Sequence, residues 1–219
     1  MRLKTKHVAV NKSVLEKSGP WYFPPLGSLI TAGGRLLLTM LERCVTDAGG
    51  SYLFCDTDSL CIVSNEYGGL IACRGGSYSL KDGREAVKAI SWRKVDDIAI
   101  RFNSLNPFNR QLVQHILKIE DVNFVDSDVS KPRRQLYGYA ISAKQYALYI
   151  STGNKISIVK ASGHGLGYLY PPKRGFDEKA DAPEWIVEAW NWLLHMELGI
   201  TCQRPIWLGY PAMSTCRPQ

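Results

Sequence analysis

The sequence predicts an α+β fold, in which helices pack on antiparallel strands and a small, mainly helical part follows at the C-terminal side. Three observations favour this class. Apolar residues recur at helical spacing in three segments, two apolar runs flank a short polar turn near residue 57, and strand-like runs fill the middle of the chain. The 219 residues are enough for one domain with a substantial core or for two small lobes.

The first long element expected is a helix over residues 26–47. Residues 1–19 before it show little periodicity and end at Gly-Pro, which is typical of a boundary. Gly33 and Gly34 inside the helix cost about 1 kcal/mol each relative to alanine, so we expect another backbone to pack closely there. Gly49 follows the helix and ends it. The apolar residues at helical spacing are Leu26, Leu29, Ile30, Leu37, Met40, Leu41 and Cys44.

The next element is a hairpin over residues 52–63, whose turn carries Asp56 and Asp58. Residues two apart in an extended segment point the same way, so we expect the two carboxylates to lie together. Like charges repel, and a cation relieves that cost. Mg²⁺ prefers such oxygen ligands and leaves room for substrate phosphates, so the pattern predicts metal-assisted phosphoryl transfer. The alternative is an ordinary turn, because aspartate favours turns for local reasons.

The rest of the chain predicts alternating helices and strands. Residues 64–83 are rich in glycine and polar residues and predict a loop or a small insertion, and 92–104 predict an amphipathic helix. Strands are expected over 116–124, 136–142, 145–150 and 155–160, with a turn at residues 153–154. A last helix is expected over 183–198, with proline at its start and Gly199 past its end.

Composition and charge narrow the function classes. No run approaches the ~20 apolar residues of a membrane span, and no apolar segment follows the basic start, so neither a membrane partner nor a secretory signal is expected. The net charge is +7, and residues 120–175 hold eight Lys/Arg against four Asp/Glu, which suits a polyanion. The alternative is a solvated basic surface with no partner. The six cysteines lack zinc-site spacing, so we expect reduced thiols and a cytoplasmic location.

Residues 54–59, Phe-Cys-Asp-Thr-Asp-Ser, resemble the aromatic-Gly-Asp-Thr-Asp-Ser signature in the palm of family B DNA polymerases, with Cys55 in place of glycine. The resemblance implies that Asp58 is the firmer Mg²⁺ ligand and that Asp56 helps to position primer or metal. It also places Thr57 and Ser59 among the residues near DNA.

A second segment, residues 140–148, resembles the Lys-Lys-Arg-Tyr segment of the same family. Lys144 and Tyr146 match, whereas Ala143 and Gln145 depart from the pattern. The resemblance implies that the lysine and tyrosine approach the primer–template. The alternative is an exposed lysine beside a half-buried strand tyrosine.

Weaker matches follow in the expected order along roughly residues 19–215, closest to a bacterial B-type polymerase-like branch. Lys160, in a Lys-Ala-Ser-Gly-His-Gly run with His164, is a candidate contact for the DNA backbone. Glu120 and Asp121 could join the metal site, but a salt bridge is the simpler expectation. The resemblance thus implies an antiparallel palm-type sheet with packed helices in residues 20–175, a basic segment at 1–19, and a partial thumb-like segment at 176–219.

Two parts of the family pattern are missing from this sequence. Nucleotidyl transfer uses two metal ions ~3.5–4 Å apart, and the family supplies one carboxylate from an earlier palm motif. Neither that motif nor the lysine-rich fingers helix is found. The resemblance therefore implies a fragment or subunit of a B-type DNA-directed DNA polymerase that is inactive alone. Its partners would be primer–template DNA, dNTP and, for a split enzyme, a second polypeptide with the missing motifs.

Two other classes stay open. The first is a non-catalytic DNA-binding remnant that keeps the basic strands. The second is a metal-dependent nucleotide-sugar transferase, because that class also uses an Asp-x-Asp site.

Overall fold

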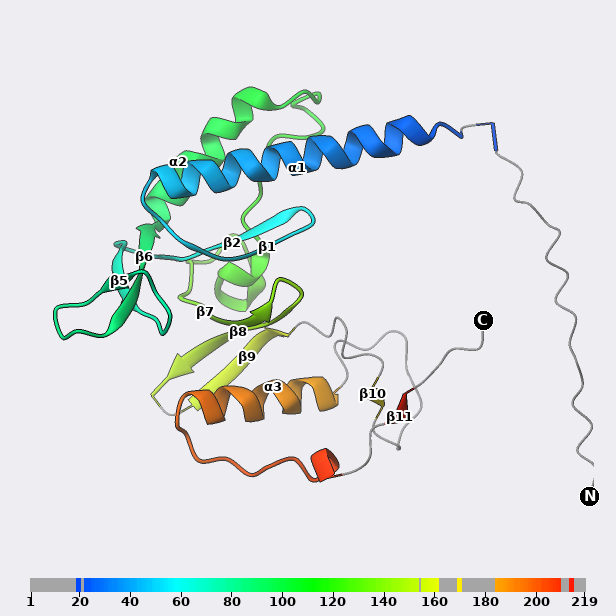
Figure 1. The fold of residues 1–219 in the computed structure, drawn as a ribbon. Coiled ribbons are helices and arrows are strands. Elements are labelled where there is room, and N and C mark those ends of the chain that lie inside the picture. The colour runs from blue at the N-terminus through cyan, green and yellow to red at the C-terminus, as the bar shows by residue number, and fades with distance from the viewer. Residues whose placement is uncertain are drawn as a thin grey trace, which may run out of the picture.

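The computed structural model describes residues 19–20, 22–153, 155–161, 169–170, 184–209 and 213–214, and it confirms the α+β fold (Figure 1). Almost all of the basic segment 1–19, His164 and the expected boundary at 175/176 lie outside these residues. The α-helices are α1 (Pro24–Asp47), α2 (Trp92–Phe102) and α3 (Glu184–Glu197), and the short 3₁₀ helices are η1 (Asn103–Leu105), η2 (Asp121–Asn123), η3 (Val125–Ser127) and η4 (Ile206–Gly209). The helices expected over 26–47, 92–104 and 183–198 are thus confirmed.

The strands of the described residues form four small sheets. A hairpin pairs β1 (Tyr52–Asp56) with β2 (Ser59–Ile62). A second sheet has the order β3 (Ser64–Asn65), β6 (Glu85–Ser91), β4 (Gly69–Ala72), with β5 (Tyr78–Ser79) also paired to β6. A third is the antiparallel meander β7 (Tyr137–Ser142), β8 (Gln145–Thr152), β9 (Lys155–Ala161), and the last pairs β10 (Leu169–Tyr170) with β11 (Met213–Ser214). The strands expected over 136–142, 145–150 and 155–160 are confirmed.

Helix α1 begins and ends where its sequence predicts. Pro24 and Pro25 occupy its first positions, where a fixed φ suits a helix. Gly49, just past its end, has a φ of +71°, a conformation that glycine adopts at little cost. At Gly50 an added Cβ would lie 2.6 Å from the side chain of Ile90, so only glycine lets the chain pass this close to β6.

The close packing expected at Gly33 and Gly34 is not found. A Cβ added to either glycine meets no heavy atom within 4 Å. The neighbouring side chains of Leu29, Ile30 and Leu36 are 62% to 68% exposed. Figure 1 shows this N-terminal half of α1 extending beyond the body of the molecule. Within the described residues, nothing covers it.

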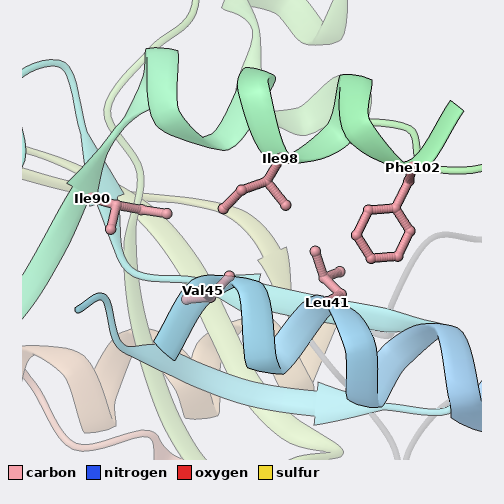
Figure 2. Close-up of a cluster of buried hydrophobic side chains, with 5 residues drawn as sticks. All are labelled: Leu41, Val45, Ile90, Ile98 and Phe102. Atoms are coloured by element: carbon pink, nitrogen blue, oxygen red, sulfur yellow. The ribbon is translucent and has the colours of Figure 1, made fainter. Parts of the chain in front are cut away.

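The first core lies where the C-terminal half of α1 meets α2 and β6 (Figure 2). Ser91 caps α2, its hydroxyl accepting a hydrogen bond from the Lys94 backbone N–H at 3.3 Å. The cap turns the chain directly from β6 into α2, so that strand and helix contribute to one cluster. Its buried residues are Leu41, Val45, Ile90, Ile98 and Phe102.

Of two expectations for the segments around this core, one is wrong. Residues 64–83 form a small insertion with strands and not a simple loop, because they contain β3, β4 and β5, whose two to four residues are too short to show a period in the sequence. Residues 116–124 are not a strand, and apart from an isolated bridge at Phe124 they form irregular chain and η2. Their apolar residues Ile116 and Leu117 pack against the first core, which explains an apolar pattern without a ladder.

The second core lies between α3 and the β7–β9 sheet. Trp190 of α3 is 1% exposed, and its ring meets Tyr139 of β7 edge-on, with the centroids 6.4 Å apart. Ala147 and Tyr149 face this core from β8. The residues that alternate with them along β8, Tyr146 and Leu148, point to the other side of the strand and line a cavity beside the β1–β2 hairpin. Strand β8 therefore separates the second core from the hairpin.

A β-bulge in β9 decides which side Lys160 faces. Ile156 and Ile158 pack on the second core, so simple alternation would send Lys160 there too. The register between β8 and β9 shifts at this point: Tyr149 pairs with Ile158, but Leu148 pairs with Lys160. The extra residue reverses the alternation, so that Lys160 lines the cavity and Ala161 joins the core.

Candidate functional site

The two aspartates lie at the tip of the β1–β2 hairpin. Asp56 ends β1 and pairs with Ser59, the first residue of β2, so Thr57 and Asp58 alone form the turn. Thr57 has a φ of +46°, and the Asp58 N–H donates to the Asp56 carbonyl at 2.6 Å. The segment is a tight turn, so the premise that the carboxylates occupy two positions of an extended strand is wrong. A positive φ at threonine is strained, and such strain is often found at functional sites.

The turn and a lysine hold the Asp56 carboxylate. The Thr57 hydroxyl donates to Asp56 Oδ1 at 2.9 Å, and Lys144 Nζ lies 3.6 Å from the same oxygen. The Ser59 hydroxyl donates to the Asp56 carbonyl at 3.2 Å. Thr57 and Ser59 thus use their hydroxyls within the turn. The Lys144–Asp56 contact thus joins the segment 140–148 to the hairpin motif 54–59.

A ring stack joins the same two motifs. Phe54 of β1 stacks on Tyr146 of β8, with ring centroids 4.1 Å apart and planes inclined by 27°. Figure 1 shows the hairpin lying between α1 and the β7–β9 sheet. At Gly138 of β7 an added Cβ would lie 2.5 Å from a terminal methyl group of Leu53, so β7 and β1 approach closely at this glycine. The predicted site residues Asp56, Lys144 and Tyr146 therefore share one surface.

A cavity of about 420 Å³ opens beside the hairpin, a size within the usual range for small-ligand sites. Its apolar lining includes residues of α2 and residues 116–117. Asp58 lines it, whereas Asp56 does not. Its charged and polar lining includes Asp58, Ser59, Ser64, Lys118, Glu120, Asn123, Arg133, Arg134, Tyr146 and Lys160.

Ion pairs organise the basic side of the cavity. Lys160 Nζ donates to Glu120 Oε2 at 2.8 Å, and Lys118 pairs with Asp121 at 2.9 Å. The salt-bridge expectation for Glu120 and Asp121 is thus confirmed, although neither lies on a strand. Burial lowers the pKa of Lys160, but the hydrogen bond and charge of Glu120, together with Tyr146, outweigh it and leave that pKa above its ordinary value.

Two arginines at the cavity were missed by the sequence reasoning. Arg134 Nε donates to the Val122 carbonyl at 2.9 Å, and Arg133 pairs with Asp96 of α2 and lies 5.9 Å from the Phe124 ring centroid. Both anchor the 121–127 turns to the body of the molecule. The signal that could have found them is the adjacent arginine pair in the basic section.

The hairpin cysteines do not face each other. Cys61 pairs with Phe54, and Cys55 pairs with Leu60. Both thiols are free, which fits the expectation of reduced cysteines. Burial, helped by the Glu120 charge and opposed by Lys160, raises the pKa of Cys61 to about 11.

The Cys61 thiol should make stability fall at high pH. Its ordinary pKa is 9.0, so between pH 9 and about 11 the unfolded chain loses this proton while the folded chain keeps it. This thiol should then lower the free energy of unfolding by about 1.4 kcal/mol for each pH unit in this range. Below pH 9 both states keep the proton, so the full stability is present there. Urea unfolding of the wild type and of Cys61→Ala across this range isolates the effect. Equal slopes for the two proteins would contradict it.

The hairpin presents the oxygen donors that Mg²⁺ prefers. Asp58 offers carboxylate oxygens to the cavity, and Asp56 offers a second carboxylate on the same turn. Mg²⁺ is often held by one or two carboxylates with water and phosphate, so these residues fit such an ion. The described part of the chain brings no three His, Cys, Asp or Glu side chains together as a metal site. A second metal ion would need carboxylates from elsewhere.

Comparison with protein-family models, curated proteins and solved structures finds no match to the chain. Among the described residues, none of the helices has the length and apolar character required to cross a membrane. The case for a function therefore depends on the residues of the site.

Proposed function

We propose that this chain is a fragment or subunit of a B-type DNA-directed DNA polymerase, and that it contributes part of the nucleotidyl-transfer site and part of the primer–template surface. One observation carries the proposal. Two motifs almost 90 residues apart in sequence meet through the Phe54–Tyr146 stack and the Lys144–Asp56 ion pair. An isolated Asp-x-Asp turn would not need a lysine and a tyrosine from a distant strand beside it.

Each residue has a defined role in this proposal. Asp58, with Asp56 beside it, would hold Mg²⁺, and the bound ion supplies electrostatic stabilisation of phosphate oxygens. Lys144 and Lys160 would attract the DNA backbone, because Lys and Arg contacts to phosphate release condensed counterions. Tyr146, stacked on Phe54, would present a rigid aromatic surface next to the hairpin. A two-metal site needs carboxylates from two motifs, and this chain supplies only the motif with Asp56 and Asp58. We therefore propose that it is inactive without a partner polypeptide.

Binding of a fluorescently labelled primer–template by the purified chain tests the DNA surface. Lys160→Ala should weaken binding several-fold and reduce the slope of log K against log salt by about one, as the loss of one phosphate contact does. Lys144→Ala should act in the same direction. Lys155→Ala is the matched control, because it removes an exposed lysine from the other end of the same strand, β9. Equal effects of Lys155→Ala and Lys160→Ala would indicate non-specific attraction only.

Glu120→Gln provides the opposite perturbation. The change removes the carboxylate that accepts the Lys160 hydrogen bond, so DNA affinity should increase. Asp47→Asn is its control: Asp47 pairs with Arg43 on α1 at 2.8 Å, and its loss changes the net charge equally. A weaker DNA complex for Glu120→Gln would contradict the role given to Lys160.

A non-catalytic DNA-binding remnant is the second candidate, and the Lys144–Asp56 pair favours it. A lysine held 3.6 Å from Asp56 already neutralises part of the charge that a metal ion would neutralise. DNA binding that Mg²⁺ does not change would support this candidate. Binding of a nucleotide sugar without DNA affinity would instead favour the nucleotide-sugar transferase.

A further inference from the structure

The N-terminal half of α1 has an apolar face that continues the face buried in its C-terminal half. Leu37, Leu41 and Val45 pack into the first core. The same side of the helix carries Leu26 and Ile30, three and two turns before Leu37, where they are 54% and 68% exposed. A helix of this kind gains most of its stability from burial of its apolar face. Half of that face is uncovered in the described part of the chain.

The exposed area is large enough for a specific interface. Six large apolar side chains at the start of α1 are between 54% and 69% exposed. Together they present on the order of several hundred Å², the size above which an exposed apolar patch marks an interaction site. A standard interface buries about 800 Å² on each partner. The six residues are Tyr22, Phe23, Leu26, Leu29, Ile30 and Leu36.

Charge argues against a membrane or nucleic acid on this face. The only charged residue from Pro24 to Met40 is Arg35. It lies with Ser28 and Thr31 on the opposite, polar side of the helix. Helices that lie on membranes carry many lysines and arginines on the polar face, and DNA-binding helices need them as well. The partner expected is another apolar protein surface.

The order of residues on the face identifies that surface. Counted outward from Gly33, apolar residues stand three, four and seven positions away in both directions. Two antiparallel copies of α1 crossing at Gly33 would therefore pair Leu26 with Met40 and Ile30 with Leu36, and would place Leu29 against the part of Leu37 that the first core leaves exposed. Arg35 and Thr31 lie on the opposite side of the helix, so no charged side chain enters the interface. Such self-complementarity is what a two-fold interface requires.

We propose that this chain forms a homodimer in which the N-terminal halves of two α1 helices pack antiparallel about Gly33. Gly33 and Gly34 supply the close approach, since an added Cβ at either meets no heavy atom of the described residues within 4 Å. The partner copy thus explains the two glycines, which cost helix stability and which the described residues of a single chain do not use. The inference is independent of the proposed function.

Sedimentation velocity of the full chain at micromolar concentrations tests the dimer. The wild type should show a species of twice the 24.5 kDa chain mass. Ile30→Asp should raise the dissociation constant at least about 30-fold, because a buried position of the interface is lost in both copies. Thr31→Asp adds the same charge to the polar face and should leave the constant unchanged. Circular dichroism of both variants verifies that α1 is retained.

A cysteine at the crossing point tests the geometry. In Gly33→Cys the two thiols would lie at the two-fold axis, within reach of a disulfide. Mild oxidation should give a cross-linked dimer well above the level formed by the wild type with its native cysteines. Ala32→Cys should not exceed that level. A wild type that stays monomeric, a dimer unaffected by Ile30→Asp, or equal cross-linking of the two cysteine variants would overturn the proposal, and monomeric behaviour would assign the face to a different polypeptide.

Discussion

Replacing Asp58 by asparagine is expected to lower the affinity of the chain for divalent cations by at least 10- to 100-fold, the range already caused by losing a residue that only supports a ligand. The side chain lines the cavity next to Ser59 and stands on a strained turn. Asparagine keeps its size and its turn preference but removes the negative charge. Binding of Mn²⁺ as a probe for Mg²⁺, followed by calorimetry in the presence of primer–template, measures the effect.

Two further substitutions test which carboxylate matters. Asp56→Asn should have a smaller effect, because Lys144 and the Thr57 hydroxyl already contact that carboxylate. Asp47→Asn on α1 should have none. Equal losses for Asp56→Asn and Asp58→Asn would contradict the division of roles. Unchanged Mn²⁺ affinity in Asp58→Asn would remove the metal site and leave the DNA-binding remnant as the better interpretation.

In an active assembly reconstituted with a polypeptide that carries the missing carboxylate, Asp58→Ala should abolish nucleotide transfer. Full activity of that assembly would refute the assignment of Asp58. The measurement is primer extension at saturating Mg²⁺, with the wild-type chain in parallel.

The elements that the sequence predicts correctly are those with local signals. Helix α1 has prolines at its start and Gly49 after its end, and the β1–β2 hairpin has two apolar runs around a turn rich in aspartate. Strands β7 to β9 have β-branched and aromatic residues and a turn at Gly153, whose φ is +62°. Each signal is contained within a few residues, so no knowledge of the tertiary fold is needed to recognise it.

The failures arise where distant contacts decide. The apolar residues at 116–117 pack on α1 and α2 instead of pairing as a strand. The side that Lys160 faces was not predicted, because it depends on the register between β8 and β9: the bulge near Val159 turns Lys160 toward the cavity, away from the core that Ile156 and Ile158 face. The proximity of Lys144 to Asp56 could be expected only from the family resemblance, because no local pattern relates two segments so far apart.

The second large effect concerns Trp190, which ties α3 to the sheet that carries half of the site. It is 1% exposed and packs among the residues of the second core. Ala147 of β8, which is fully buried in that core, lies between Tyr146 and Leu148, both of which line the cavity. Loss of packing behind β8 should therefore loosen the strand that positions Tyr146 against Phe54.

Trp190→Ala is expected to lower the free energy of unfolding by about 3–5 kcal/mol, the usual cost of deleting a buried tryptophan side chain. That loss is a large part of the total free energy of unfolding of a typical protein, about 5–15 kcal/mol. DNA binding by the variant should therefore also decrease. Trp192→Ala is the matched control: it lies on the same helix, is only partly buried, and is not part of the second core. Urea unfolding should show a clearly smaller loss for Trp192→Ala, and Trp190→Phe should fall between the two. Similar losses for the two alanine variants would mean that α3 packs on the sheet through a different face, and the mechanical link from α3 to Tyr146 would then be wrong.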